Sequence, residues 1–460
     1  MRSLVLVSFA ALLACYNQPP PLGQGSEGSD SSASGSSGGG SDTVTTSDTS
    51  PSTTASTTAS TTASTTASTT ATTDPTGSTD PTDPSATGPS DSSSGDAPPA
   101  CGDGHVDMGE FCVEDPADVF DVGNGATDIV LADLDGGGVD VATLNISAST
   151  VSILFNDGVG GLGNLQSETV ADNSCRIQAA DGEGDGDVDL VIAGDTIVSL
   201  VNDGSGSFDR NDSDVAPFGG CLDHNDLGVL NDNGGPLDVV FSGAYNNTYA
   251  PGVNPGSGWA FTSPSGIGGI TEGSSGVTVT EFLYDVDNVA DVIVLNQYGS
   301  DGELFRGNNQ GGFTDAGTYD ACGGLGFGAR FAATGDLDSD GQTDIVTTCM
   351  EGNFTVAFGN DDGSFDAPVE VLYDGAHRPL VADVNGDDYP DLLVSSTSLS
   401  RINVYINDGT GMPGAPVQLD VGGPARSVAV GDIDGDGALD IAAAFTDGSG
   451  GHVALWRAMP

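Results

Sequence analysis

Residues 432–440 read DIDGDGALD, and the apolar run IAAAF follows at once at residues 441–445. Carboxylates stand at positions 1, 3, 5 and 9 of the acidic segment, and glycines interrupt it. An apolar run of five residues is too short for a helix and is typical of a buried strand. The segment therefore predicts a tight acidic turn, with Asp440 as the first residue of the strand that follows.

The same pattern recurs seven times towards the C-terminus, each time with an aspartate before a short apolar run. Successive aspartates lie 47 to 53 residues apart. About 50 residues with several short β-type runs is the length of one four-stranded propeller blade. We therefore predict an all-β fold, a seven-bladed β-propeller over residues 117–460. The opening aspartates are Asp140, Asp189, Asp238, Asp291, Asp344, Asp391 and Asp440.

The two ends of this region predict a closed ring. Residues 118–124 (DVFDVGN) are similar to residues 417–423 (VQLDVGG), which precede the last repeat, and the last apolar run is HVALW at 452–456. The N-terminal segment is expected to supply the fourth strand of the final blade, which leaves no open sheet edge.

Four acidic turns keep the full pattern and predict cation sites. Oxygen ligands at positions 1, 3, 5 and 9 suit calcium, which accepts six to eight oxygens, better than magnesium with its strict octahedron. An EF-hand would need Glu at position 12, where Ile192, Thr347, Val394 and Ala443 stand. The alternative is an acidic turn without metal. The predicted ligands are Asp181, Glu183, Asp185, Asp189, Asp336, Asp338, Asp340, Asp344, Asp383, Asn385, Asp387, Asp391, Asp432, Asp434, Asp436 and Asp440.

Three further turns are degenerate and are weaker candidates. The turn with Asp133, Asp135 and Asp140 is one residue short and has Gly137 at a ligand position. The turn at residues 285–291 is two residues short, and residues 231–233 (NDN) precede Asp238 without the full pattern.

The N-terminus predicts export and a lipid anchor. Arg2 precedes an apolar run at residues 4–13, which is about half the length of a membrane-spanning helix. Residues 12–15 (LLAC) resemble the lipobox of bacterial lipoproteins, which implies a signal peptide at residues 1–14 and acylation of Cys15. An ordinary cleaved signal peptide is the alternative. Because Tyr16 follows the cysteine instead of an inner-membrane Asp signal, we expect an outer-membrane lipoprotein exposed at the cell surface.

Composition separates a linker from the repeats. Residues 15–99 are rich in Ser, Thr, Pro and Gly, with five STTA units at 52–71, so they predict a disordered stalk. The whole chain has 67 acidic and nine basic residues, a formal net charge of −58. This balance argues against binding to nucleic acid or to an anionic membrane surface, so membrane contact is expected through the lipid anchor only.

Six cysteines follow Cys15 in a chain that is expected to be exported, where disulfides form. Residues 100–116 form a small Cys-rich element whose predicted bond is Cys101–Cys112; a zinc site with His105 lacks a fourth ligand. We also predict the pairs Cys175–Cys221 and Cys322–Cys349, although six cysteines allow 15 pairings and free thiols are the alternative.

Four arginines occupy one equivalent position in different repeats. Arg176 and Arg378 lie five residues before an acidic turn, and Arg330 and Arg426 lie six before. They are expected to begin the innermost strands, near the channel and opposite the acidic turns. With His377 they form a candidate ligand face for an anion. The alternative, which we favour, is that each arginine only joins neighbouring blades.

The tandem acidic turns are similar to the Asp-x-Asp-x-Asp-Gly-x-x-Asp motif of the FG-GAP/VCBS repeat family, with departures at Glu183, Asn385 and Asp388. That family includes the seven-bladed propeller of integrin α-subunits. The resemblance implies a calcium-stabilised propeller that binds a protein or glycan outside the cell. We expect a monomer. We also expect no enzymatic activity, because the sequence has no catalytic triad, phosphate loop or His-rich metal cluster. A purely structural surface protein, and a polysaccharide-active enzyme using His377, remain the alternatives.

Overall fold

The computed structural model describes residues 111–114, 117–194, 196–213, 227–230, 238–241, 250–252, 274–280, 290–308, 312–323, 328–350 and 352–459. The chain divides into two units, Met1–Asn17 with Asp96–Pro460 and Gln18–Gly95, and every described residue lies in the first. The predicted signal peptide, Cys15 and the linker 15–99 lie outside the described residues. Within the described part, no helix is long and apolar enough to span a membrane.

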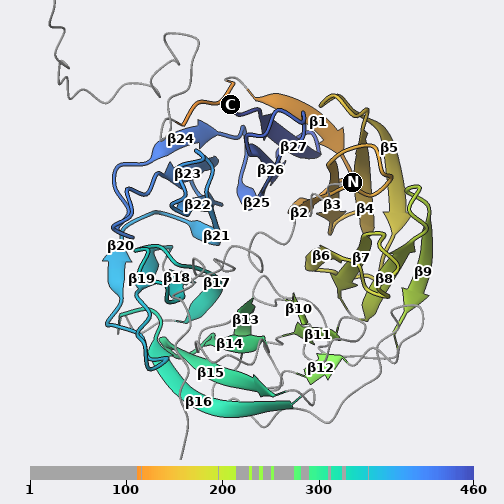
Figure 1. Ribbon diagram of the computed structural model, residues 1–460. Helices are drawn as coiled ribbons and strands as arrows, with labels where there is room; N and C mark the ends of the chain where they lie inside the picture. Colours follow the sequence, from red (N-terminus) through yellow and green to blue (C-terminus); the bar gives the residue numbers. More distant parts are fainter. Residues whose placement is uncertain are drawn as a thin grey trace, which may run out of the picture. The chain divides into compact units, whose positions relative to one another are not determined.

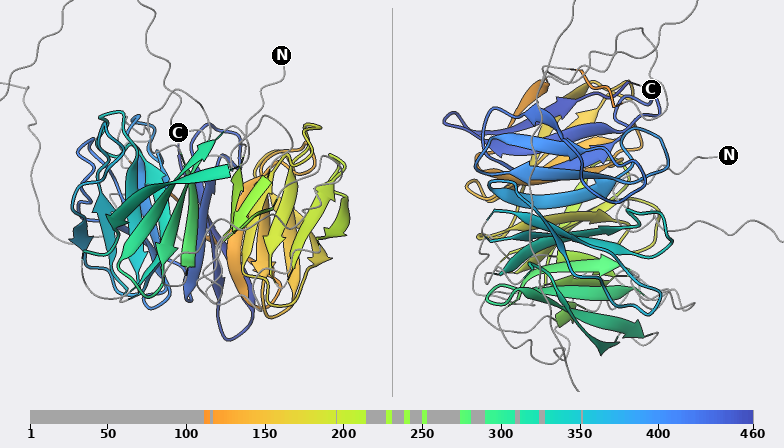
Figure 2. Two further views of the ribbon diagram at one scale, coloured as in Figure 1. Left: turned by 90° about the horizontal axis from the view of Figure 1, so that it is seen from below. Right: turned by 90° about the vertical axis from the view of Figure 1, so that its left-hand side faces the viewer.

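The described residues form 27 strands in seven antiparallel sheets (Figure 1). The innermost strands contact one another in a closed circuit, so the sheets surround a common axis as the blades of a β-propeller. Seen from the side, the strands run between the two faces of this ring (Figure 2). In circuit order, the innermost strands are β2, β6, β10, β13, β17, β21 and β25.

The predicted aspartates open the second strand of every sheet, as the sequence pattern required. The first three sheets are β2 (Ala126–Ala132), β3 (Asp140–Asn145), β4 (Thr150–Asn156) and β5 (Leu162–Thr169); β6 (Arg176–Ala180), β7 (Asp189–Ala193), β8 (Ile197–Asn202) and β9 (Phe208–Asp212); and β10 (Leu227–Leu230), β11 (Asp238–Phe241) and β12 (Ala250–Gly252).

The next three sheets are β13 (Ser274–Thr280), β14 (Asp291–Asn296), β15 (Asp301–Asn308) and β16 (Gly312–Asp320); β17 (Ala329–Gly335), β18 (Asp344–Cys349), β19 (Phe354–Ala357) and β20 (Val369–Val371); and β21 (Ala376–Ala382), β22 (Asp391–Ser396), β23 (Arg401–Tyr405) and β24 (Val417–Asp420).

The last sheet joins both ends of the ring. It contains β25 (Ala425–Gly431), β26 (Asp440–Thr446), β27 (Gly451–Trp456) and, from the start of the ring, β1 (Asp118–Val122). β1 pairs with β27 in antiparallel register, with Asp121 opposite His452. The predicted closure by the N-terminal segment is confirmed. Residues 111–114 extend this contact, because Glu114 N–H donates to the Arg457 carbonyl at 2.8 Å and Phe111 is buried in the adjacent core.

The blade count differs from the prediction. Six sheets have the four strands of a complete blade, whereas the sheet β10–β12 has three short strands among the described residues. This is the repeat with the degenerate turn at residues 231–233, which lies outside the described residues. The expected count of seven complete blades is therefore reduced to six complete blades and one three-stranded sheet between β9 and β13.

The core lies between neighbouring blades. One cluster joins Val130 and Leu144 of one blade to Ile177 and Leu190 of the next, all at most 6% exposed. Similar clusters join the other pairs of neighbouring four-stranded blades. Because burying one such aliphatic side chain contributes about 1.5–3 kcal/mol, these interfaces hold the ring together and present the acidic turns at one edge of each blade.

Candidate metal centres and the arginine cluster

The acidic turns join the innermost strand of a blade to its second strand. The turn 432–440, for example, leads from β25 to β26, and Asp440 is fully buried at the start of β26. Asp140, Asp189, Asp344 and Asp391 occupy the same place in their own blades and are also fully buried.

The last aspartate of each turn ties the turn to the third strand of its blade. In the turn 336–344, Asp344 Oδ2 accepts from Leu337 N–H at 2.7 Å and Oδ1 accepts from Gly359 N–H at 2.8 Å. Asp440 repeats both bonds with Ile433 and Ala458, at 2.8 and 2.9 Å. These carboxylates therefore organise the turn whether or not a cation is bound.

The first aspartate of each turn shapes the turn from inside. Asp336 accepts from Asp340 N–H and Gly341 N–H at 3.0 Å each. The sixth position needs a positive φ, which Gly341 takes at 90° and Asp388 at 71° in the turn 383–391. A non-glycine residue is strained in this region, so the turn 383–391 carries a local cost that its counterparts avoid.

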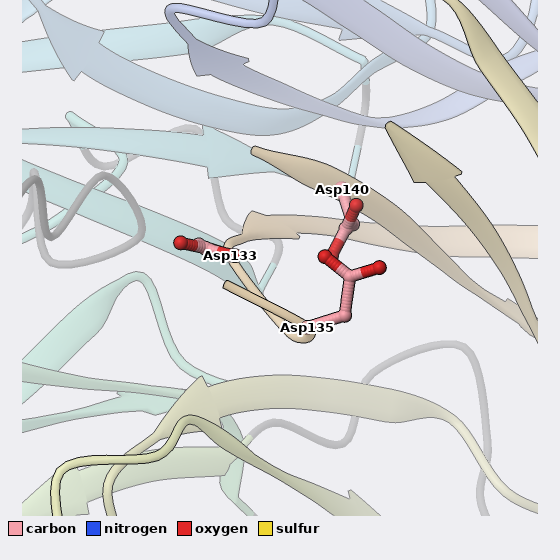
Figure 3. Close-up of side chains that lie close together, drawn as sticks. All are labelled: Asp133, Asp135 and Asp140. Atoms are coloured by element: carbon pink, nitrogen blue, oxygen red, sulfur yellow. The ribbon is translucent and has the colours of Figure 1, made fainter. Parts of the chain in front are cut away.

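Three turns bring three carboxylates within 4.8 Å of one another: Asp133, Asp135 and Asp140; Asp336, Asp338 and Asp344; and Asp432, Asp434 and Asp440. Figure 3 shows the first of these, with the carboxylates of Asp135 and Asp140 side by side at the turn between β2 and β3. The shared ligand positions are the first, the third and the last.

The turn 133–140 was expected to be a weaker candidate, yet it gathers its carboxylates as closely as two intact turns. The reason is that Gly137 replaces the fifth position, which contributes to none of the three clusters. The fifth aspartates bond within the turn instead, as Asp436 accepts from Ala438 N–H at 2.9 Å.

Two intact turns do not form such an all-carboxylate cluster. In the turn 181–189, the third position is the longer Glu183, whose Oε2 is buried without a hydrogen-bond partner among the described residues. In the turn 383–391, the third position is an amide, and Asn385 Nδ2 donates to Asp387 Oδ2 at 3.0 Å. The turns at 231–238 and 285–291 lie outside the described residues except for their strand-opening aspartates.

Gathering carboxylates in a buried turn changes their proton affinity. Burial, with the neighbouring charges of Asp135 and Asp133, raises the pKa of Asp140 to about 7 against the lowering effect of two backbone N–H donors. Burial likewise raises the pKa of Asp344 to about 7 and that of Asp440 to about 6. A bound cation would relieve this repulsion.

The donor set decides which metal fits. Each cluster offers carboxylate oxygens without histidine or cysteine, which suits a hard cation such as calcium and not zinc. The residues that would hold the ion are those at the first, third and last positions. A cation there would neutralise the turn and fix it against the blade.

The predicted arginines meet near the ring axis. Arg176 Nη1 lies 2.9 Å from both carboxylate oxygens of Asp128, a residue of β2 that is fully buried. Arg378 Nε lies 3.9 Å from the same carboxylate although β25 separates β21 from β2 in the ring. Asp128 was not predicted; its signal is a lone acid within the apolar run of residues 126–132.

His377 and two arginines surround Phe331. The guanidinium carbons of Arg378 and Arg330 lie 4.1 and 5.9 Å from the centre of the Phe331 ring, and the His377 ring lies at 4.8 Å. His377 is 3% exposed; Nδ1 lies 2.6 Å from the Arg426 carbonyl, and Nε2 has no hydrogen-bond partner. Burial, and then the arginine charges, hold the pKa of His377 well below its usual value, so the ring is neutral.

One predicted disulfide, Cys322–Cys349, is present and joins the start of a blade to the end of its second strand. Cys112 and Cys175 are also disulfide-bonded. Their predicted partners, Cys101 and Cys221, lie outside the described residues.

Comparison with known families agrees with this architecture. A family model described as "FG-GAP-like repeat" matches residues 284–347, 336–394 and 383–443. Each match starts at or near one acidic turn and ends in the second strand of the next blade. This chain therefore contains FG-GAP-like repeats arranged in a β-propeller. No curated protein matches the chain in sequence.

Solved structures share the fold at low identity. A chain in the crystal structure of BBS1N in complex with ARL6DN is 12% identical, with a TM-score of 0.51, covering 74% of this chain and 95% of that one. Chaetomium thermophilum Raptor is 10% identical, with a TM-score of 0.52, covering 76% of this chain and 29% of that one. An Agrocybe aegerita lectin that recognises non-reducing terminal N-acetylglucosamine is 20% identical, with a TM-score of 0.47, covering 65% and 81%. These likenesses concern the fold alone.

Proposed function

We propose that this chain is a calcium-binding β-propeller that recognises a protein or glycan ligand outside the cell. The observation that supports calcium binding is the recurrence of one geometry: three turns, each with three aspartates within 4.8 Å. Calcium tolerates six to eight oxygens in an irregular shell, whereas magnesium requires a near-ideal octahedron. The carboxylates and nearby backbone carbonyls of a single turn match the first requirement.

Thermal unfolding of the full chain tests calcium binding. The melting temperature should rise when calcium is titrated into the chelator-treated protein, and magnesium at equal concentration should raise it far less. Each site adds about 2.7 kcal/mol of stability when free calcium is 100 times its dissociation constant. A melting temperature that is the same in calcium and in chelator would contradict the proposal.

The arginine cluster supports an anionic ligand as the recognised group. Arg330, Arg378 and Arg426 act on the same neutral His377, in a chain whose formal net charge is −58. A carboxylate or sulfate on a glycan or protein would meet three arginines close together here, in an otherwise acidic chain. The competing role is blade joining, for which the buried Arg176–Asp128 pair is an example.

A glycan array separates these two roles. Wild type and Arg330→Gln are compared in calcium, with Arg210→Gln as the control, because Arg210 pairs with Asp212 at the exposed strand β9. Loss of anionic-glycan binding by Arg330→Gln at unchanged stability supports the ligand site. Loss of stability alone, or no binding by wild type, supports a structural surface protein. Product formation that His377→Ala abolishes would support the polysaccharide-active alternative.

We further propose that the sheet β10–β12 is the inner part of a seventh blade. β10 contacts β6 on one side and β13 on the other, which is the place of an innermost strand. Hydrogen exchange should show amides of the central strand β11 that exchange as slowly as those of β7 and β14. Fast exchange throughout β10–β12 would contradict a seventh blade.

Attachment to the outer membrane through Cys15 completes the proposal. Mass spectrometry of the mature protein should find an acylated Cys15 as the first residue, and Cys15→Ser should release the protein from the membrane fraction. An unmodified mature chain that begins elsewhere would contradict the lipid anchor.

A further inference from the structure

Three segments with the pattern Asn-Asp-Gly-x-Gly, residues 156–160, 202–206 and 407–411, look like simple hairpin turns in the sequence. In the structure each also contacts the acidic turn of the neighbouring blade. The blade β6–β9, for example, lies beside the blade β2–β5 (Figure 1), and Asn202 of the former reaches Leu134 of the latter.

The Asn202 side chain uses its whole hydrogen-bonding capacity. Its Nδ2 donates to the Leu134 carbonyl at 2.7 Å and to the Val188 carbonyl at 2.9 Å. Its Oδ1 accepts from Gly204 N–H and Gly206 N–H, both at 3.2 Å. Leu134 belongs to the turn 133–140 and Val188 to the turn 181–189, so one amide group, 3% exposed, joins two candidate metal turns.

Asn156 and Asn407 repeat this arrangement. Asn156 Nδ2 donates to the Ile433 carbonyl at 2.6 Å in the preceding blade and to the Val139 carbonyl at 3.0 Å in its own. Asn407 Nδ2 donates to Leu337 at 2.6 Å and to Pro390 at 3.0 Å in the same way.

The contacted residue is the one whose N–H also holds the last aspartate of the turn. Leu134 N–H donates to Asp140 Oδ2 at 2.8 Å while its carbonyl accepts from Asn202. Leu337 stands in the same position between Asp344 and Asn407. The asparagine therefore fixes, from outside, the residue whose N–H orients a buried candidate ligand.

The last glycine of each segment lies against a second candidate ligand. A Cβ added at Gly160 would lie 2.5 Å from Asp434 Cβ, and one at Gly411 would lie 3.1 Å from Asp338 Cβ. Both aspartates are the third residues of turns in the preceding blade. At Gly160 a larger side chain would displace the aspartate, and at Gly411 it would first displace Phe358. Both glycines also have a positive φ, which disfavours other residues.

Among the described residues, the turns that receive an asparagine from the next blade are the turns with three clustered aspartates. Ile433, Leu134 and Leu337 belong to the turns 432–440, 133–140 and 336–344. The turn 383–391 lies outside that set, and in the next blade Ala458 takes the asparagine's place: its N–H donates to Asp440 Oδ1 at 2.9 Å, as Asn202 N–H does to Asp189.

We propose that Asn156, Asn202 and Asn407 are positioning residues for the cation sites of the preceding blade and couple those sites to the sites of their own blades. This inference rests on the calcium binding proposed above. Among the described turns, 432–440, 133–140 and 181–189 form one linked set, and 336–344 and 383–391 form a second. Ala458 stands where an asparagine would join the turn 383–391 to the turn 432–440. Calcium binding within a set is cooperative because one ion stiffens a turn that an asparagine side chain joins to the turn of the next site.

Calorimetric calcium titration of the full chain tests this coupling. The variants are Asn202→Ser, Asp135→Asn and their combination. Asn202→Ser should weaken calcium binding about 10-fold at one or two sites, the size typical for a residue that orients a metal ligand. In the Asp135→Asn background the same substitution should cost at least several-fold less, because the neighbouring site is already impaired.

Asn360→Ser is the matched control, since Asn360 lies in the equivalent hairpin of another blade. Among the described residues, its side chain makes only long hydrogen bonds, of 3.4 Å to Ser364 and 3.5 Å to Asp366 of its own turn. It should leave calcium binding unchanged. If Asn202→Ser fails to fold, Asn407→Ser with Asp338→Asn provides the same cycle in the second set.

The outcomes separate the two proposals. No calcium binding by wild type overturns both. If wild type binds calcium and Asn202→Ser binds it with unchanged affinity, the coupling alone is overturned. The same holds if the losses of calcium affinity in the two single variants simply multiply in the double variant. A loss of calcium affinity in Asn202→Ser that is no larger than the loss in Asn360→Ser also overturns the coupling.

Discussion

Asp128 on β2 and Arg176 on β6 form a charged pair between the innermost strands of adjacent blades, with both carboxylate oxygens 2.9 Å from one guanidinium nitrogen. Ile177 N–H adds a third bond to Asp128 at 3.0 Å. Burial alone would raise the pKa of Asp128, but the charges of Arg176 and Arg378 outweigh it, and the pKa is lowered. The carboxylate is therefore charged and belongs to the structure of the ring centre.

Asp128→Ala should lower the free energy of unfolding by about 3–5 kcal/mol, because it leaves buried guanidinium charge without its carboxylate. Asp212→Ala is the control: it breaks the Arg210 pair, whose Asp212 side chain is 54% exposed, and should cost at most about 1 kcal/mol. Urea unfolding measures both. Equal losses of unfolding free energy for the two variants would mean that the Asp128–Arg176 pair stabilises the interface between blades no more than an exposed ion pair does.

The buried His377 predicts a specific dependence of stability on pH. Its pKa in the folded protein is well below the unfolded value of 6.5. Just below pH 6.5, His377 therefore binds a proton in the unfolded chain but stays neutral in the folded protein. This contribution to stability is complete above pH 6.5 and is lost as pH falls below it. His377→Gln should therefore flatten the decline in urea midpoint between pH 7 and pH 5, measured in excess calcium. An unchanged decline would show that another group causes it.

Much of the fold follows from one repeated signal. An aspartate before a short apolar run recurs at blade spacing, and each such aspartate opens a second strand in the structure. The similarity of residues 118–124 to residues 417–423, which include β24, also predicted that the N-terminal segment completes the last blade, where β1 pairs with β27. Both features are local in sequence or periodic along it, which is why they can be recognised without a structure.

The contacts between blades could not be predicted in the same way. Asn156 and Ile433 are 277 positions apart, and the Asn-Asp-Gly pattern is already explained by its turn. Asp128 likewise depends on arginines from two other blades. The spacing of the turn 133–140 was misleading because the residue it lacks is not one that the carboxylate cluster uses.

The Cys322–Cys349 bond should contribute substantially to stability. It closes a segment of 27 residues between two buried sulfurs, for which chain entropy in the unfolded state predicts about 3–4 kcal/mol. Cys322→Ala with Cys349→Ala should lose that amount in urea unfolding under non-reducing conditions. Wild type in strong reductant should approach the variant, and a variant as stable as oxidised wild type would contradict the prediction.

Substitutions in a single turn can separate its structural carboxylate from a carboxylate that serves only the cation. Asp440→Asn places an amide NH₂ group where a carboxylate oxygen accepts from Ile433 N–H or from Ala458 N–H. One buried N–H donor then has no acceptor, which should lower the free energy of unfolding by about 1–3 kcal/mol. This loss should appear in chelator as well as in calcium. Asp434 Oδ1 accepts from Asp436 N–H at 3.2 Å, a bond that an amide oxygen can keep.

Asp434→Asn should therefore leave unfolding in chelator unchanged and reduce only the gain in stability that calcium brings. Urea unfolding of both variants, each with and without calcium, provides the comparison. A similar loss for both variants in chelator would show that the two aspartates share one structural role. A calcium-dependent gain that survives Asp434→Asn in full would remove Asp434 from the ligands, and the cation would then depend on Asp432, Asp440 and backbone carbonyls of the turn.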